Sequence, residues 1–284
     1  MQIANRVWPW AWRGVLLVFI AGPVAWAMAY ALAYSLGGVG RLSAGWTTDH
    51  WQTALSEPRV VGGGLYSLLI AGCVTMLVML VTFALLLAFP GVRHDKGLLL
   101  VMVVLLGTPA LVQAQMVAHL IGPGGWVSRL AYHAGLVDSA AQFPRLVNDR
   151  FSVGLTLSIS LALLPLAFLY FSQLWDAARI DGCCRVAQSL GATPSQTRCR
   201  VALPLLIARG KSMLLLLFIM ALGSYEIPLL LGRLSPQMVS VATQQLTTGF
   251  DLALKPQGYV LASLYLICTS LMLAVFIRSR RPHD

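Results

Sequence analysis

Charged residues are scarce in this chain, and acidic residues are the scarcest. Only 11% of the 284 residues are charged and only ten are acidic, whereas 58% are hydrophobic. The mean hydropathy is +0.76. Soluble domains carry about 25% charged residues, so this composition excludes an ordinary soluble protein. The sequence therefore predicts an integral membrane protein.

Motifs of several enzyme classes are also missing. The sequence has no H-E-x-x-H and no G-x-S-x-G motif, which excludes the zinc peptidases and hydrolases that carry them. Gly210-Lys211-Ser212 matches only the end of a phosphate-binding loop, because Leu205 stands where that loop requires its first glycine. We therefore expect no catalytic residue and no cofactor in this chain.

Metal-binding patterns are equally lacking. Cys183 and Cys184 are adjacent and do not have the C-x-x-C spacing of zinc sites, and His119 has no second ligand nearby in the sequence. We expect five free thiols and no metal. The net charge of +10 does not indicate nucleic acid either, because the Lys and Arg residues lie mostly at the ends of apolar runs instead of in one clustered patch.

Six apolar runs are near or above the ~20 residues that cross a bilayer. Backbone groups in lipid must bond within their own segment, so such runs are helices. The expected fold class is all-α, a polytopic protein with six transmembrane helices at residues 14–36, 60–89, 98–121, 151–174, 205–231 and 258–277.

Orientation follows from the basic residues in alternate connections. Thirteen of the 20 Lys and Arg residues fall on one side and seven on the other, which places both termini and the 176–204 segment in the cytoplasm. Arg6 and Arg13 before the first apolar run also fit a signal peptide. That run exceeds the 7 to 15 apolar residues of a signal core, so a retained helix is expected.

The cytoplasmic segment 176–204 has a clear internal pattern. Gly191 interrupts a helical pattern, and Thr193 to Gln196 has the form of a capping box with Pro194 at the first helical position. Leu203-Pro204 is expected to close the element as the chain re-enters the membrane. We therefore predict a helix, a glycine turn and a short capped helix between the fourth and fifth membrane helices.

The spacing of Gly191, Pro194, Val201 and Leu203-Pro204 resembles the EAA loop of ABC importer permeases, which are inner-membrane components of binding-protein-dependent transport. The Glu-Ala-Ala of that loop falls on Arg185-Val186-Ala187, so Arg185 replaces the glutamate. The family often has aromatic residues at the places of Ser195 and Arg198. The resemblance covers about residues 46–277 and implies a coupling helix that contacts a cytosolic ATPase through Arg185, Ala187, Gly191, Ala192, Thr193, Pro194, Gln196, Leu203 and Pro204.

The same resemblance implies the partners. They are a cytosolic ABC ATPase dimer that holds ATP and Mg²⁺, a second permease subunit in a homodimer or heterodimer, a periplasmic or surface solute-binding protein, and the lipid bilayer of the bacterial inner membrane. It also implies two regions, an N-terminal segment with the first helix at 1–45 and the permease domain at 46–284.

Polar residues inside the predicted spans are candidates for the pathway. Thr108, Gln115 and His119 follow at spacings of seven and four, which places them on one face of a continuous third helix. Such residues face a water-filled cavity or bond between helices, and both alternatives stay open.

Glu226, next to Tyr225, is the one acidic residue expected inside an apolar span. A charge there costs about 3 kcal/mol on insertion scales, so it requires a partner, a proton or water. The stretch SYEIPLLLG around it resembles the corresponding helix of spermidine/putrescine- and thiamine-type importers, which implies a small organic cation as substrate. In the other interpretation, Glu226 bonds a neighbouring helix and fixes a bend at Pro228.

Two rival classes remain. A secondary transporter would use Glu226 as its ion or proton site, but such folds usually carry internal repeats, and the two halves of this sequence show no convincing repeat. A membrane-embedded enzyme would require polar residues that converge from several spans, and here they are sparse.

Overall fold

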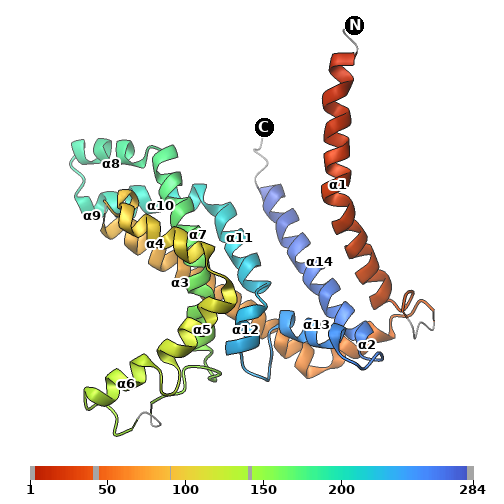
Figure 1. Cartoon of the computed structure of the whole chain (residues 1–284). Coiled ribbons are helices and arrows are strands. Elements are labelled where there is room, and N and C mark those ends of the chain that lie inside the picture. Colours follow the sequence, from red (N-terminus) through yellow and green to blue (C-terminus); the bar gives the residue numbers. More distant parts are fainter. Residues whose placement is uncertain (1–3, 41–44, 90, 140–142, 280–284) are drawn as a thin grey trace. The chain divides into compact units, whose positions relative to one another are not determined.

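The structure, a computed structural model, describes residues 4–40, 45–89, 91–139 and 143–279 (Figure 1). Within these ranges the chain is helical and contains no strand, which confirms the all-α class. The chain divides into two compact units. Unit 1 combines residues 1–62 with 242–284, and unit 2 comprises residues 63–241. The predicted division at residue 45 stays a prediction.

Unit 1 is built from the two ends of the chain. α1 (Ala4–Ser35) packs against α14 (Lys255–Ser279), which also contacts the short α2 (Asp49–Ser56). The rings of Tyr34 and Tyr259 lie 4.2 Å apart between centroids, and Trp51 donates from Nε1 to Ser35 Oγ at 3.2 Å. The ring contact joins α1 to α14, and the hydrogen bond joins α1 to α2.

The central helix of unit 2 is α7 (Val153–Ala177). It contacts α4, α5, α8, α10, α11 and α12. The largest buried side chains of the core include Phe168 and Phe171 on α7, both 0% exposed. Phe171 meets Phe83 of α3 edge to face at 5.0 Å. Two helices are shared with unit 1, namely α3 (Pro58–Ala88) and α13 (Val239–Thr248). The other elements of unit 2 are η1 (Val92–His94), α4 (Lys96–Gly107), α5 (Ala110–Ile121), α6 (Trp126–His133), α7, α8 (Ile180–Ser189), α9 (Pro194–Thr197), the π-helical η3 (Arg198–Ala202), α10 (Leu203–Arg209), α11 (Lys211–Leu222) and α12 (Glu226–Leu231).

Four of the predicted membrane spans are single helices. α1, α3, α7 and α14 are long and apolar enough to cross a membrane, and the number rises to six if each of two bent helix pairs is one span. These counts refer to the described residues. The chain is therefore membrane-embedded, with four to six candidate spans.

The predicted third and fifth helices are not continuous, and on this point the sequence prediction was wrong. The third divides into α4 and α5, because Pro109 has no N–H to donate and holds Thr108 extended at ψ 128°. The chain bends by 110° between residues 96–107 and 110–133. The fifth divides at Gly210, where the chain bends by 61° between residues 194–209 and 211–222, and again before α12.

A buried glutamine closes the first of these breaks. The side chain of Gln113 donates from Nε2 to the carbonyl oxygens of Leu105 at 2.6 Å and Thr108 at 3.1 Å, and only 2% of the residue is exposed. A break in a membrane-type helix leaves carbonyls without partners, and a buried carbonyl without a hydrogen bond is costly. Gln113 therefore stabilises the bend between α4 and α5.

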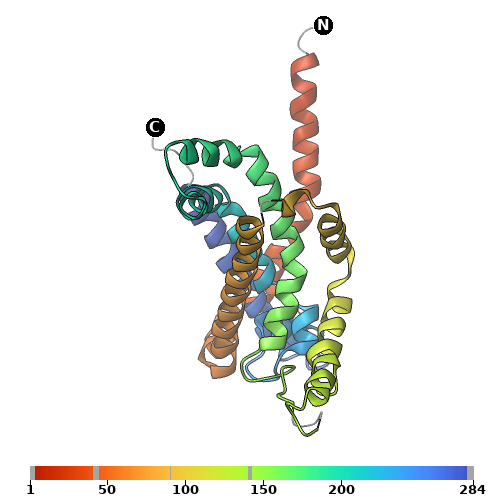
Figure 2. The same cartoon turned by 90° about the vertical axis from the view of Figure 1, so that its left-hand side faces the viewer.

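The two ends of unit 2 carry different polar elements. α8 and α9 lie together at one end of α7, and α6 lies at the other end (Figures 1 and 2). Phe151 and Leu234, both large and apolar, are exposed outside the helices.

Candidate functional site

The most structured polar feature is the α8–α9 element, residues 180–197, at the end of α7. The chain turns from α7 into α8 through Arg179, whose φ of 49° is left-handed, and Ile180 then anchors the start of α8 with 0% exposure. A left-handed residue other than glycine persists only where its surroundings hold it. The corner between α7 and α8 is therefore a defined joint.

Gly191 ends α8 in the predicted turn. Its φ is +90°, the Gly191 N–H donates to Gln188 O, and the Ala192 N–H donates to Ala187 O, both at 3.0 Å. This pair of bonds is a Schellman motif, in which a left-handed residue closes the last helical carbonyls. No atom lies within 4 Å of a Cβ built on Gly191, so the backbone conformation, and not crowding within the chain, requires glycine here.

The predicted capping box of α9 is confirmed. The Gln196 N–H donates to Thr193 Oγ1 at 3.3 Å, the Thr193 N–H donates to Gln196 Oε1 at 3.1 Å, and Pro194 occupies the first helical position. Two of the N–H groups that a helix start leaves open are thereby satisfied.

Leu203-Pro204 does not close the element as predicted. Helical structure runs from Pro194 through η3 and α10 to Arg209. The π-helical turn before the proline explains the difference, since the Leu203 N–H reaches back to Arg198 O and the widened turn accommodates a residue that cannot donate. α9 therefore continues without a break into the bent pair α10–α11.

The predicted coupling residues lie on an open surface. Of the nine, Arg185, Gly191, Thr193, Pro194, Gln196 and Pro204 are exposed, while Ala187, Ala192 and Leu203 are half-buried. The sequence analysis missed two apolar neighbours, Val186 and Leu190, which are 61% and 83% exposed. Val186 on α8 and Leu190, the C-cap residue of that helix, are four residues apart and therefore lie on one face, a signal that the sequence did contain.

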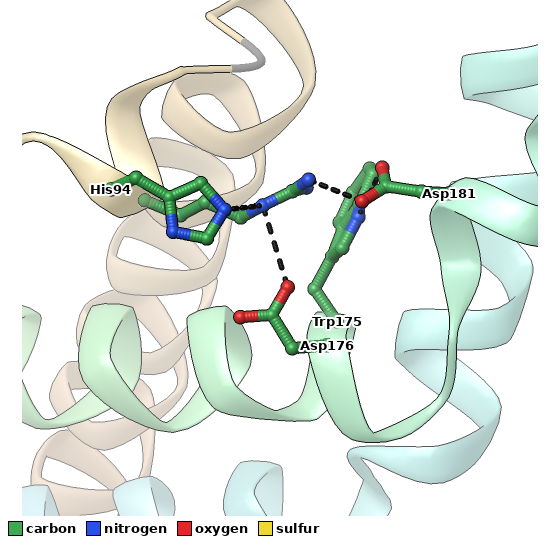
Figure 3. A network of polar contacts seen from close by, with 5 residues as sticks. His94, Trp175, Asp176 and Asp181 are labelled. Atoms are coloured by element: carbon green, nitrogen blue, oxygen red, sulfur yellow. Dashed lines mark hydrogen bonds and ion pairs between the residues drawn. The ribbon is translucent and has the colours of Figure 1, made fainter.

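A second missed feature is a polar network around Arg93, which belongs to η1 in the turn between α3 and α4 (Figure 3). Its guanidinium pairs with Asp176 at the end of α7, at 3.5 Å, and with Asp181 at the start of α8. Trp175 Nε1 donates to Asp181 Oδ1 at 2.9 Å. Arg93 also donates from Nε to His94 Nε2 at 3.2 Å. The network joins three elements of unit 2.

The network perturbs the titration of Asp181. Partial burial by itself would raise the pKa of this carboxyl, but the hydrogen bonds from Arg93 and Trp175, with the charges of Arg93 and Arg185, hold its pKa below the usual value. Burial raises the pKa of the Cys184 thiol, and the charge of Asp181 adds to this effect. Cys183, Cys184 and Cys199 are free thiols, as predicted. No group of three His, Cys, Asp or Glu side chains suited to a metal occurs in the part of the chain that the structure describes.

The predicted polar face of the third span does not form. Thr108 caps the end of α4 and donates to Val104 O at 2.8 Å, while Gln115 and His119 lie beyond the bend, exposed on α5. The spacing of seven and four residues assumed one straight helix, and the break at Pro109 removes that condition. A role of these residues in a pathway stays a prediction.

The sequence analysis placed Glu226 inside a membrane span, but in the structure this residue does not lie in the middle of a helix. It starts α12, where Tyr225 is the N-cap residue, and its side chain is exposed. A carboxylate in the first turn is favourable because the helix dipole is positive there. Pro228 stands within the first turn, where no N–H is needed, so it helps to begin a helix instead of bending one.

Comparison with known proteins gives a fold. No protein-family model and no curated protein sequence matches the chain. Among solved structures, the chain is similar to a chain of a bacterial ABC transporter involved in the import of the acidic polysaccharide alginate. The TM-score is 0.68 at 15% sequence identity, and the match covers 99% of this chain and 100% of the other. The two chains therefore share a fold along their whole length.

Proposed function

We propose that this chain is a permease subunit of an ATP-driven importer, which forms part of a solute pathway and couples it to a separate ATPase. The observation that carries the proposal is the α8–α9 element, a rigid and exposed pair of short helices at one end of a membrane-embedded unit. The fold shared with a chain of a bacterial ABC importer supports it.

The surface of the α8–α9 element suits a protein partner. Val186 and Leu190 present apolar side chains to the outside, and Arg185 adds a positive charge beside them. A docking helix that transmits force must resist deformation, and here the Schellman turn at Gly191 and the capping box at Thr193 fix both ends of the short connection.

The partners of the proposed complex follow from this role. An ATPase pair in the cytosol would bind the α8–α9 elements of two permease subunits, identical or different, and would carry ATP and Mg²⁺, so that this chain is not itself an enzyme. A solute-binding protein on the outer side would deliver the substrate. The bacterial inner membrane is the proposed location.

The substrate class that we propose is a small organic cation of the polyamine or thiamine kind. The support is the exposed carboxylate of Glu226 beside the half-buried ring of Tyr225, since a carboxylate and an aromatic face both attract cations. The structurally similar transporter is involved in the import of an acidic polysaccharide, so its cargo has the opposite charge.

The first experiment isolates the permease from membranes in mild detergent and measures the ATP hydrolysis that co-purifies with it. Gly191→Asp is compared with Gly135→Asp. Both glycines have positive φ, +90° and +70°, and neither has an atom within 4 Å of a built Cβ, but Gly135 follows α6 at the other end of unit 2. The two variants therefore carry the same kind of backbone strain.

We expect Gly191→Asp to lose the associated ATP hydrolysis and Gly135→Asp to keep it. If the chain supports proton-coupled uptake without any ATPase, the secondary-transporter alternative with Glu226 at its centre replaces the proposal. Stimulation of hydrolysis by spermidine or thiamine, and not by an acidic oligosaccharide, would support the substrate class, and the reverse order would reject it.

A further inference from the structure

Arg93 is a cation with little contact with water. Its side chain is 9% exposed, whereas the side chains of its partners Asp176 and Asp181 are 54% and 51% exposed. The guanidinium carbon lies 4.9 Å from the centre of the Trp175 ring, in the position of a cation–π contact. A charge withdrawn from water is retained only where its partners compensate for the lost hydration. The arginine is therefore held on several sides at once.

The two carboxylates stand on either side of the corner between α7 and α8. Asp176 belongs to the last turn of α7 and Asp181 to the first turn of α8, with the left-handed Arg179 between them. Arg93 binds both, and Trp175 Nε1 holds the second oxygen of Asp181 at 2.9 Å. The planar fork of an arginine suits this, since it presents several donors in fixed directions. Figure 3 shows Asp176, Asp181 and the Trp175 ring of this network.

The helix dipoles favour the positions of Arg93 and Asp181, although not that of Asp176 at the negative end of α7. A cation near the end of α7 meets the negative end of that helix, and an anion in the first turn of α8 meets the positive end of the next. The corner is therefore stabilised by charges on both sides and by a residue from a different part of the chain, 88 positions before Asp181.

We infer that Arg93 is a positioning residue, which fixes the angle at which α8 leaves α7 and ties the α8–α9 element to the turn between α3 and α4. This inference rests on the proposed function, because it gives the α8–α9 element a mechanical connection to membrane-type helices other than α7. When the element is displaced by a partner, Arg93 carries the displacement to η1 and hence to the adjoining ends of α3 and α4.

The tie itself is tested on the whole chain in lipid nanodiscs by amide hydrogen exchange, without any partner. Arg93→Gln and Asp181→Asn each remove one side of the charge pair with little change in size. The control is Lys96→Gln, which removes an exposed positive charge from the same turn. We expect amides of residues 178–190 to exchange about tenfold faster in both network variants, as for a lost hydrogen bond between charged groups, and not in the control.

The need for a two-sided contact is tested by Arg93→Lys. A lysine keeps the charge, but its three N–H donors sit on one nitrogen and do not form the planar fork that binds both carboxylates. We expect the amides of residues 178–190 in Arg93→Lys to exchange at a rate between those of the wild type and of Arg93→Gln. Amide exchange as slow in Arg93→Lys as in the wild type would show that simultaneous binding of both carboxylates is not needed. Unchanged exchange in Arg93→Gln and Asp181→Asn would show that Arg93 does not fix the position of α8.

Transmission is tested on the complex that co-purifies with its ATPase, compared without nucleotide and after arrest with ATP and vanadate. In the wild type, exchange at residues 91–97 should differ between the two states. In Arg93→Gln the ATPase should remain bound while this difference shrinks about fivefold or more, an effect that a purely stabilising role would not produce. If the exchange of residues 91–97 differs between the two states as much in Arg93→Gln as in the wild type, Arg93 does not transmit the displacement. If no ATPase is bound to the wild type, the proposed function is rejected, and so is the passage of a displacement from α8–α9 to η1. The hydrogen exchange of the isolated chain still decides whether Arg93 positions α8.

Discussion

The ring of Phe171 occupies the place that a side chain on Gly210 would take. A Cβ built on Gly210 would lie 2.3 Å from Phe171 Cε1, closer than any real contact of this kind. Phe171 is completely buried in the core around α7, so it cannot move aside at little cost. The bend between α10 and α11 therefore depends on a glycine that lets another helix approach.

Gly210→Ala should destabilise unit 2, because overpacking of a filled core costs about 1–3 kcal/mol. Thermal unfolding of the detergent-solubilised chain, followed by circular dichroism, would show a lower Tm. Gly72→Ala is the control, since α3 leaves nothing within 4 Å of a Cβ at that helical position. Equal Tm values for the two variants would contradict the close approach.

Two glutamines on α5 separate a structural role from a pathway role. Gln113 is 2% exposed and bonds the carbonyls at the α4–α5 break, whereas Gln115 is exposed. Gln113→Ala should lower stability by about 1–3 kcal/mol, because the Thr108 carbonyl loses the hydrogen bond from Nε2 and the Leu105 carbonyl keeps the one from the Thr108 N–H. Gln115→Ala should leave the unfolding midpoint in place. If Gln115 lines the pathway, its substitution changes transport alone, and a stability loss at Gln115 instead would reject the assignment of the two roles.

Local signals in the sequence were sufficient for much of this structure. The capping box needs only Thr193, Pro194 and Gln196, and the turn at Gly191 needs only a residue that accepts a positive φ. Four long apolar runs likewise correspond to α1, α3, α7 and α14. Each of these features depends on residues that are neighbours in the chain.

The features that the sequence analysis missed depend on residues far apart in the chain or on how a break is closed. Nothing near Gly210 in the sequence indicates that Phe171 packs against it, and Arg93 carries no local sign of its pairing with Asp181. Pro109 did mark a break, but its importance was hidden because the surrounding run is apolar enough to cross a membrane as one helix. The sequence alone also did not distinguish Gln113, which is buried, from Gln115, which is exposed.

Removal of the cap on α9 should loosen that helix without unfolding the protein. Thr193→Ala loses the acceptor for the Gln196 N–H, and substitutions of this kind cost about 0.5–2 kcal/mol. Amide hydrogen exchange at residues 195–198 should become faster accordingly. Ser195→Ala, an exposed site one residue past Pro194, is the control and should leave exchange unchanged. A lower midpoint of global unfolding in Thr193→Ala would show that the cap stabilises more than α9.

The Asp181 carboxyl gives a prediction for pH. Its pKa is lowered below 3.8 by Arg93 and Trp175, so the ionised form is favoured by folding. The resulting stabilisation is fully present above the usual pKa and is lost only as the pH falls through the lowered one. Protection of residues 178–190 should therefore not change between pH 8 and pH 5 on account of this group.

Arg93→Gln should raise the pKa of the Asp181 carboxyl. With the guanidinium gone, the burial that raises the pKa of Asp181 is opposed only by Trp175 and Arg185, so the carboxyl must take up its proton at a higher pH than in the wild type. Infrared titration of the carboxyl band, with Asp181→Asn to assign it, measures this shift directly. A pKa that stays the same without Arg93 would mean that Trp175 alone holds the carboxylate, and the arginine would then bind Asp181 without controlling its charge.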